Sequence, residues 1–258
     1  MPKFWLFRTG NRLDRKFLAS TPLRFGDFEG FLQIEVKDQI FLWPKDAPRA
    51  GILRVLSEIL TPEHPHHYVW GHTKIDESDI VLDIGACEGA FSALVTAQCR
   101  RVIAVEPSRT MCTLIPALFR ARGERCPEVL NCLLGGEPGR AYFLENGANP
   151  GASRVVAEPA AGAYELSVRT LDDLAESLEQ KPTFIKCDAE GAEPAIFSGG
   201  KGFLRKLHPK LAITTYHNDG DYAAMHALLT SLGYRVAGKG FLFSPSAGAL
   251  RVQMIHAW

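Results

Sequence analysis

The sequence predicts one α/β domain built on a mainly parallel β-sheet and preceded by an N-terminal extension. The chain has 258 residues, which is enough for one well-buried domain of this class. From residue 79 onward, short apolar runs alternate with stretches of helical periodicity. This alternation is typical of parallel strands joined by right-handed helical crossovers. Residues 1–75 lack the alternation, so we expect them to form a separate extension.

The elements of the predicted sheet follow one another in a regular order. Strands are expected at residues 80–84, 101–105, 128–134, 183–188 and 211–217, and a C-terminal pair, YRVAG and ALRVQMIHAW, as an antiparallel hairpin. Ser108 is placed to cap the helix after the second strand, and Gly123 to end it. Turn residues at 146–151 predict a short hairpin or surface excursion.

The extension carries its own pattern. FLQIEV and QIFLWP flank Lys37 and Asp38 as the two strands of a hairpin would. Several phenylalanines crowd this region, together with Trp5. Two interpretations stay open, namely packing of the extension on the core and a cap over the substrate cleft. Residues 76–258 are expected to form the catalytic domain.

Composition excludes several classes of partner. Lys and Arg together number 29 and so do Asp and Glu, so the chain lacks the broad basic field of nucleic-acid or anionic-membrane binding. We find neither the pattern of a signal peptide nor a run long enough to span a membrane. The six cysteines contain no C-x-x-C pair, which favours a reduced, cytoplasmic protein.

The stretch VLDIGACEGAFS, at residues 81–92, joins the first predicted strand to its helix. Ligands of open α/β sheets bind beyond the carboxyl ends of the strands, and Gly85 and Gly89 would let backbone amides approach a ligand. Cys87 stands where a dinucleotide fingerprint needs its second glycine. Asp83 and Glu88 would repel a diphosphate and suit a ligand with positive charge. A purely structural tight turn is the alternative.

The second strand ends in AVEPS, which puts Glu106 where a carboxylate accepts hydrogen bonds from both hydroxyls of a ribose. A nucleoside that carries positive charge points to S-adenosyl-L-methionine.

With these motifs the chain resembles the FkbM branch of the class I methyltransferases. The resemblance runs from Tyr68 to Trp258 and rests on VLDIGACEGAFS, AVEPS, VRTLDDL, FIKCDAEGAE with GGKGFL, and LAITTYH. It implies a Rossmann-like seven-stranded sheet with an antiparallel C-terminal strand. It also implies four cofactor contacts, Asp83, Gly85, Gly89 and Glu106, and we predict Ala86, Glu88 and Asp188 as cofactor-binding residues beside them. Gly135 and Gly136 depart from the acidic or polar residue that family members often place at the adenine, which leaves backbone and apolar contacts for that base.

Two strand ends are expected beside the transferred methyl group. Asp188 and Glu190 follow the fourth strand and His217 ends the fifth, and we predict all three as catalytic. His217 is the preferred general base because the reference pKa of histidine lies near neutrality. Its alternatives are a structural strand-end histidine and a metal ligand beside Asp188, and we predict no metal. The HPHH run at 64–67 lacks zinc spacing and is predicted to be an exposed loop.

The sequence therefore predicts an S-adenosylmethionine-dependent enzyme that methylates a hydroxyl of a small molecule, saccharide or lipid. An activated sulfonium needs a positioned nucleophile and, for an alcohol, a base. Two other classes stay open: a nicotinamide-dependent oxidoreductase, and a non-catalytic cofactor-binding or interaction protein. The identity of the acceptor and the oligomeric state are not predicted.

Overall fold

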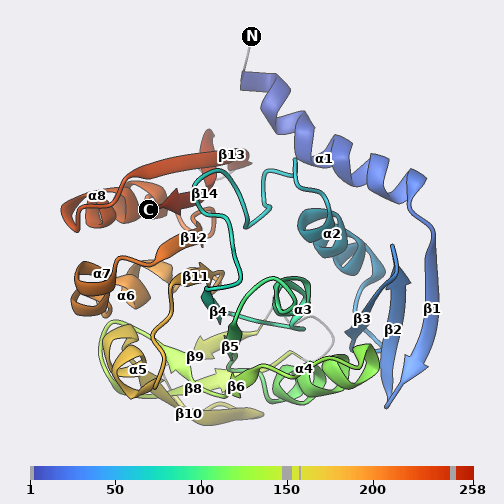
Figure 1. The fold of residues 1–258 in the computed structure, drawn as a ribbon, viewed down its shortest axis with the longest axis horizontal. Coiled ribbons are helices and arrows are strands. Elements are labelled where there is room, and N and C mark those ends of the chain that lie inside the picture. The colour runs from blue at the N-terminus through green and yellow to red at the C-terminus, as the bar shows by residue number, and fades with distance from the viewer. Residues whose placement is uncertain (1–2, 147–152, 157, 245–247) are drawn as a thin grey trace.

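The protein is described by a computed structural model that covers residues 3–146, 153–156, 158–244 and 248–258. A seven-stranded sheet with the strand order β13-β14-β12-β11-β4-β5-β6 forms its centre (Figure 1). Its strands are β4 (Ile80–Ile84), β5 (Arg101–Val105), β6 (Glu128–Leu130), β11 (Phe184–Cys187), β12 (Lys210–Thr214), β13 (Val236–Ser244) and β14 (Ala249–Ala257). Five strands run parallel, and β14 is antiparallel to both of its neighbours. The predicted fold class, including the antiparallel C-terminal strand, is confirmed.

Helices cover both faces of this sheet. They are α3 (Ala90–Val95), α4 (Arg109–Arg122), α5 (Leu171–Ser177), α6 (Glu193–Ser198), α7 (Lys201–Leu207) and α8 (Asp221–Ser231). Because successive side chains of a strand point to opposite faces, Leu82 packs with α5 to α8 while Val81 packs with α3. Figure 1 shows α5 to α8 gathered on the left of the sheet. Ser108 caps α4 by accepting from Met111 N, and Gly123 ends it, as predicted.

The N-terminal elements lie on the α3 face (Figure 1). They are α1 (Lys3–Ser20), β1 (Leu23–Phe28), β2 (Phe31–Val36), β3 (Gln39–Trp43) and α2 (Arg49–Leu60). The predicted hairpin is confirmed, with Lys37 and Asp38 at positive φ between β2 and β3. Trp43 and Leu56 are buried in one cluster with Val81 of the central sheet. The extension therefore shares a hydrophobic core with the sheet.

One predicted strand was wrong. Residues 128–134 do not form one strand, because the chain leaves the central sheet after Leu130. The Asn131 amide donates there to the carbonyl oxygens of Glu106 and Pro107, and this anchors a sharp bend. The following residues enter a small sheet with the order β7-β10-β8-β9. Its strands are β7 (Leu133–Leu134), β8 (Gly139–Leu144), β9 (Arg154–Val156) and β10 (Ala163–Arg169).

The predicted excursion near residue 146 is confirmed as a hairpin, since β8 and β9 pair antiparallel. Most of its turn, residues 147–152, lies outside the described residues. The six cysteines are free thiols. Within the described ranges, no helix combines the length and the apolar character needed to cross a bilayer.

Candidate active site

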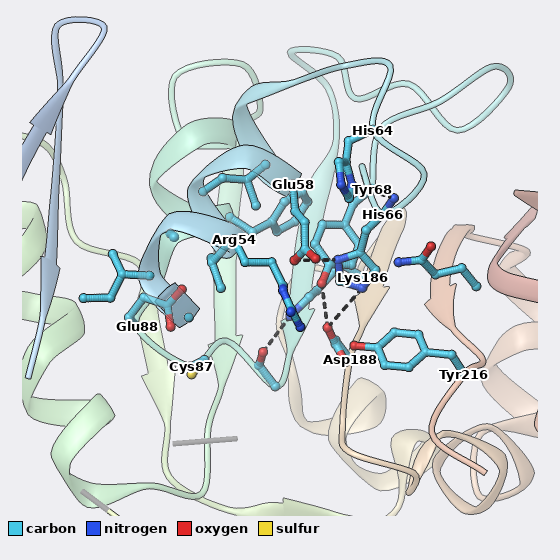
Figure 2. Close-up of a pocket in the computed structure, with 18 of the residues that line it drawn as sticks. Arg54, Glu58, His64, His66, Tyr68, Cys87, Glu88, Lys186, Asp188 and Tyr216 are labelled. Carbon is cyan, nitrogen blue, oxygen red and sulfur yellow. Dashed lines mark hydrogen bonds and ion pairs between the residues drawn. The ribbon is translucent and has the colours of Figure 1, made fainter. Parts of the chain in front are cut away.

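Two cavities open at the carboxyl edge of the central sheet, one on each side of the loop after β4. The Glu106 cavity has a volume of about 530 Å³, and its walls include Val105, Glu106, Ser108, Cys132, Leu133 and Gly191. The His66 cavity has a volume of about 490 Å³, and its walls include Trp43, Glu58, His66, Tyr68, Lys186 and Tyr216 (Figure 2). Gly85, Cys87, Asp188 and Glu190 line both cavities. These four residues form the wall where the two cavities meet.

The loop after β4 is tight for reasons of its own packing. Gly85, Cys87 and Gly89 have φ values of 69°, 50° and 77°. A Cβ atom on Gly85 would lie 1.8 Å from the carbonyl oxygen of Asp188, so only glycine fits there. Gly85 is therefore required for the tight packing of the loop, and it also lines both cavities. The structural and the ligand-binding interpretations of the loop both apply to it. Gly89 lies close to Ile115, and a Cβ atom there would be 3.0 Å from Ile115 Cγ1.

Asp83, near the end of β4, holds Lys186 in contact with this loop. Its side chain is fully buried, with Lys186 Nζ 3.0 Å from Oδ1 and Ser92 Oγ donating to Oδ2 at 2.7 Å. The Lys186 ammonium also donates to Gly85 O at 2.6 Å, which ties β11 to the loop. Asp83 does not line either cavity. We therefore correct the predicted direct contact with cofactor to a supporting role, since the buried ion pair occupies this carboxylate.

Glu106 lies as predicted at the end of β5 and faces the cavity named after it. Its carboxylate accepts from Cys87 N at 2.7 Å and from Ser108 N at 2.8 Å. Burial raises its pKa to about 7, although these two hydrogen bonds oppose the change. Glu88, which lines the His66 cavity with Ala86, has a pKa that burial also raises. Buried carboxylates of this kind favour a ligand that brings positive charge or hydroxyl donors.

The far wall of the Glu106 cavity is apolar. It includes Cys132, Leu133, Leu134, Ala141 and Phe143, and it suits a flat aromatic base. Gly135 and Gly136 do not line the cavity. Gly135 packs on Val168 of β10, and Gly136 packs on Ala195 of α6.

Asp188 is the carboxylate of the shared wall. Tyr68 donates to its Oδ2 at 2.6 Å and Thr214 donates to its Oδ1 at 3.1 Å. Burial alone would raise the pKa of Asp188, but the charges of His66, Lys186 and His217 hold it below its usual value. Asp188 is therefore an anchored anion, and it is a weak base.

His217 lies behind Asp188 and does not line either cavity. Its Nδ1 is 3.1 Å from Glu193 Oε1, and its Nε2 is 3.5 Å from both Asp188 Oδ1 and Glu190 Oε2. Burial would lower the pKa of His217, but pairing of its Nδ1 with the Glu193 carboxylate, 3.1 Å away, and the charges of Asp188 and Glu190 raise it to about 9. These contacts favour the protonated imidazole at neutral pH, which makes His217 a poor proton acceptor there. The prediction of His217 as general base is therefore inconsistent with this geometry.

The same residues include a possible metal-binding cluster. Asp188, Glu193 and His217 offer ligand atoms within 4.8 Å of one another. However, Glu193 Oε1 already accepts from Ala189 N at 2.7 Å, and it shares the single Thr214 hydroxyl hydrogen with Asp188 Oδ1. The carboxylates therefore fix the turn before α6 and hold the imidazolium, and we assign this cluster to ion pairing.

The predicted exposed loop at 64–67 was wrong. His64 and His66 are only 3% and 5% exposed, because the loop folds back against α2. His66 Nδ1 lies 3.1 Å from Glu58 Oε2, and His66 Nε2 lies 3.7 Å from Asp188 Oδ2 (Figure 2). Sequence reasoning also missed Lys186. A lysine inside the apolar strand FIKC was a usable signal, since a buried ammonium requires a carboxylate partner.

Comparisons with known proteins identify the family of this chain. The model of the methyltransferase FkbM domain matches residues 83–236, which is more than half of the chain. The chain belongs to the FkbM methyltransferase family. The FkbM match begins at Asp83, so the N-terminal elements and the loop that carries His66 lie outside it.

One solved structure shows the same fold, and two others are less similar. Methyltransferase FkbM from Methylobacillus flagellatus KT is 20% identical and has a TM-score of 0.54, and the match covers 83% of this chain and 56% of that one. Precorrin-6y C5,15-methyltransferase from Geobacter metallireducens GS-15 is 16% identical, with a TM-score of 0.42 and coverage of 71% and 81%. A Streptococcus mutans protein described as a methyltransferase, in complex with SAH, is 11% identical, with a TM-score of 0.44 and coverage of 71% and 91%. The search of curated proteins gave no match.

Proposed function

We propose that this protein transfers the methyl group of S-adenosylmethionine to a hydroxyl of a small molecule, a saccharide or a lipid. The observation that carries the proposal is the meeting of two cavities at Gly85, Cys87, Asp188 and Glu190. A cofactor in the Glu106 cavity and an acceptor in the His66 cavity would face each other across this short wall. Methyl transfer needs that in-line arrangement.

The residues of the Glu106 cavity fit the cofactor. Each oxygen of Glu106 accepts one backbone N–H, which leaves lone pairs for the two hydroxyls of a ribose. The apolar wall near Leu133 suits adenine, and the carboxylate of Glu190 suits an ammonium or a sulfonium. When bound, the cofactor supplies an activated methyl group on a positively charged sulfur. This chain has to orient the acceptor and to manage its proton.

The His66 cavity has the size and lining of a site for a polar small molecule. Trp43, Tyr68 and Tyr216 offer aromatic rings, and Glu58 and Asp188 offer acceptors for hydroxyl groups. This mixture suits the apolar faces and the hydroxyls of a saccharide-like acceptor. The N-terminal elements would act as its cap, since Trp43 and Glu58 both belong to them.

The three predicted catalytic residues take different parts in this proposal. Asp188 and Glu190 line both cavities and would orient the two reactants. His217 is a positioning residue that holds these carboxylates through its charged ring. A nicotinamide-dependent oxidoreductase is disfavoured, because its diphosphate would approach Glu88 and Glu106 closely.

Calorimetry with the full chain tests the proposal. We expect S-adenosylmethionine and S-adenosylhomocysteine to bind and NAD to give no heat. Tritium from the methyl group of S-adenosylmethionine should then appear in hydroxyl compounds offered as a panel of sugars, glycosides and lipid alcohols. Tight NAD binding without any response to S-adenosylhomocysteine would refute methyl transfer. Cofactor binding with no transfer to any compound of the panel would favour the non-catalytic alternative.

A further inference from the structure

A histidine outside the region matched by the family model faces the His66 cavity. His66 belongs to the loop after α2, and its side chain reaches the shared wall from the side opposite the glycine loop (Figure 2). At 5% exposure it is almost completely buried. A buried imidazole that faces a cavity requires an explanation, because burial without partners costs free energy.

The two nitrogens of this ring have different surroundings. Nδ1 lies 3.1 Å from Glu58 Oε2, so the carboxylate fixes the proton on Nδ1. Nε2 is buried and has no hydrogen-bond partner among the described residues. The nearest carboxylate oxygen to Nε2 is Asp188 Oδ2, at 3.7 Å, and this oxygen already accepts from Tyr68. Nε2 is therefore a polar atom that lacks a partner and lies beside the wall where the cavities meet.

We propose that His66, oriented by Glu58, is the general base that takes the proton of the acceptor hydroxyl. The inference rests on the proposed function and names the residue that makes an alcohol reactive there. An acceptor hydroxyl in the His66 cavity would donate a hydrogen bond to Nε2, which has no other partner among the described residues. A carboxylate, an imidazole and a hydroxyl in this order form the arrangement that activates weak nucleophiles.

The step balances with groups already named. The acceptor proton moves to Nε2, and the acceptor oxygen forms a bond to the methyl carbon. The electron pair of the broken carbon–sulfur bond stays on sulfur, which leaves as a neutral thioether. The imidazolium then returns its proton to water when the product departs, and Glu58 stabilises the ring while it carries charge.

Charged groups on three elements face this ring. Glu58 belongs to α2, Lys186 belongs to β11, and Asp188 follows β11. Burial would lower the pKa of His66, but the charges of Glu58 and Asp188 raise it above its ordinary value. The other titratable groups on this side are His64, Tyr68 and Tyr216. A positive charge brought to Asp188 from the Glu106 cavity would offset one of the two carboxylates and favour the neutral, basic ring.

The geometry distinguishes His66 from the other possible bases. His217 lies outside the cavities with carboxylates near both of its ring nitrogens, whereas His66 lines the cavity and its Nε2 lacks a hydrogen-bond partner among the described residues. Asp188 has a lowered pKa and two hydrogen-bond donors of its own. His66 lines the cavity, its Nε2 has no hydrogen-bond partner among the described residues, and Glu58 orients its ring.

Nitrogen NMR of the ¹⁵N-histidine-labelled full chain tests this inference without an acceptor. Spectra would be recorded against pH with S-adenosylhomocysteine and with S-adenosylmethionine, and His66→Gln would assign the signals. At pH values above the pKa of this ring, we expect a neutral His66 that carries its proton on Nδ1. We also expect its pKa to be lower with the sulfonium cofactor than with the neutral thioether. In Glu58→Gln the pKa of His66 should fall, while His217→Gln should leave the protonated nitrogen unchanged.

Two results would overturn the assignment. The first is a His66 ring that stays doubly protonated to the alkaline limit of folding in both complexes. The second is a neutral ring with its proton on Nε2. Both results presuppose cofactor binding, so they leave the proposed function intact, whereas loss of cofactor binding by the wild-type chain would refute that function itself. With an acceptor from the panel, His66→Gln should lower kcat about 10²–10⁴-fold and leave the Kd of S-adenosylhomocysteine within about twofold.

Discussion

The Glu106 cavity and the His66 cavity share a wall but are assembled in different ways. The Glu106 cavity takes its walls from residues 84–196, mainly from segments at the carboxyl ends of β4, β5 and β11 and from the small sheet. The His66 cavity collects residues from Asp14 to Gln253, and more than half of them precede the family match. The difference teaches that the part of the site expected to hold the cofactor belongs to the sheet, while the part expected to hold the acceptor depends on how the extension packs.

The charges differ in the same way. In the Glu106 cavity, the carboxylate of Glu106 accepts hydrogen bonds from two backbone N–H groups and has no cationic side chain bonded to it in the described part of the chain. At the His66 cavity, acids lie beside a base, since Glu58 Oε2 is 3.1 Å from His66 Nδ1 and Asp188 Oδ2 is 3.7 Å from His66 Nε2. The first arrangement suits binding of a cation, and the second suits movement of a proton.

The largest expected effect is at the wall that joins the two cavities. In Gly85→Ala the new Cβ would clash with Asp188 O, at 1.8 Å, and the residue would keep a φ of +69°. We expect the free energy of unfolding in urea to fall by about 2–5 kcal/mol, from backbone strain plus forced separation of the loop and β11. Binding of S-adenosylhomocysteine to the remaining folded protein should also weaken.

Gly71→Ala is the matched control for this prediction. Gly71 also has a positive φ, +57°, but nothing lies within 4 Å of its added Cβ. Its loss should be limited to strain, about 1–2 kcal/mol. Equal losses in the two variants would mean that the loop and the Asp188 carbonyl separate easily, and the shared wall would then not be a rigid element.

Sequence reasoning found the Glu106 side of the molecule because its signals are local. VLDIGACEGAFS and AVEPS each place a functional residue directly after a strand, where the topology of an α/β sheet makes it a cavity wall. The same reasoning placed Asp188 and Glu190 correctly at the cavity edge. It misjudged the strand at 128–134 because a side-chain hydrogen bond from Asn131, invisible in the apolar pattern, ends the pairing.

The His66 side escaped for a physical reason. Glu58 and His66 are eight residues apart, and their contact depends on how the loop after α2 folds back against this helix, which no periodicity encodes. Polar residues such as HPHH look exposed until a tertiary partner buries them. His217 was misjudged for a different reason. The strand predicted to end at residue 217 ends at Thr214, and the three carboxylates around the His217 ring raise its pKa.

The next largest effect concerns the cluster of His217 with Asp188, Glu190 and Glu193, which we expect to affect stability and not cofactor binding. The pKa of His217 is about 9 in the folded protein against 6.5 ordinarily, so its charged ring stabilises the fold fully below pH 6.5. This contribution is lost as the pH rises through 9. We expect the wild-type free energy of unfolding, relative to that of His217→Gln, to decrease by up to about 3 kcal/mol between these limits.

Urea unfolding at several pH values measures this difference. His226→Gln, on α8 and away from the carboxylates, is the control and should keep the wild-type slope. The Kd of S-adenosylhomocysteine should change little in His217→Gln, because His217 does not line the Glu106 cavity. If the free energy of unfolding of His217→Gln changed with pH as it does in the wild type, the His217 ring would not be the group whose charge the three carboxylates stabilise.

The smallest effect tests whether the Glu106 cavity can be changed alone. Glu106→Gln keeps the shape of the side chain but removes its charge and one acceptor, so we expect the Kd of S-adenosylhomocysteine at pH 8 to rise by roughly 5–30-fold, or about 1–2 kcal/mol. Because the pKa of Glu106 is about 7, the wild-type protein carries a neutral carboxyl below that pH and a carboxylate above it. Affinity in calorimetry should therefore increase as the pH rises through 7 in the wild type and stay flat in Glu106→Gln.

Val55→Ala, in the wall of the His66 cavity, should show the wild-type Kd and the wild-type pH dependence. If Val55→Ala weakened binding as much as Glu106→Gln, the ligand would extend through both cavities, and their division into a cofactor side and an acceptor side would be wrong.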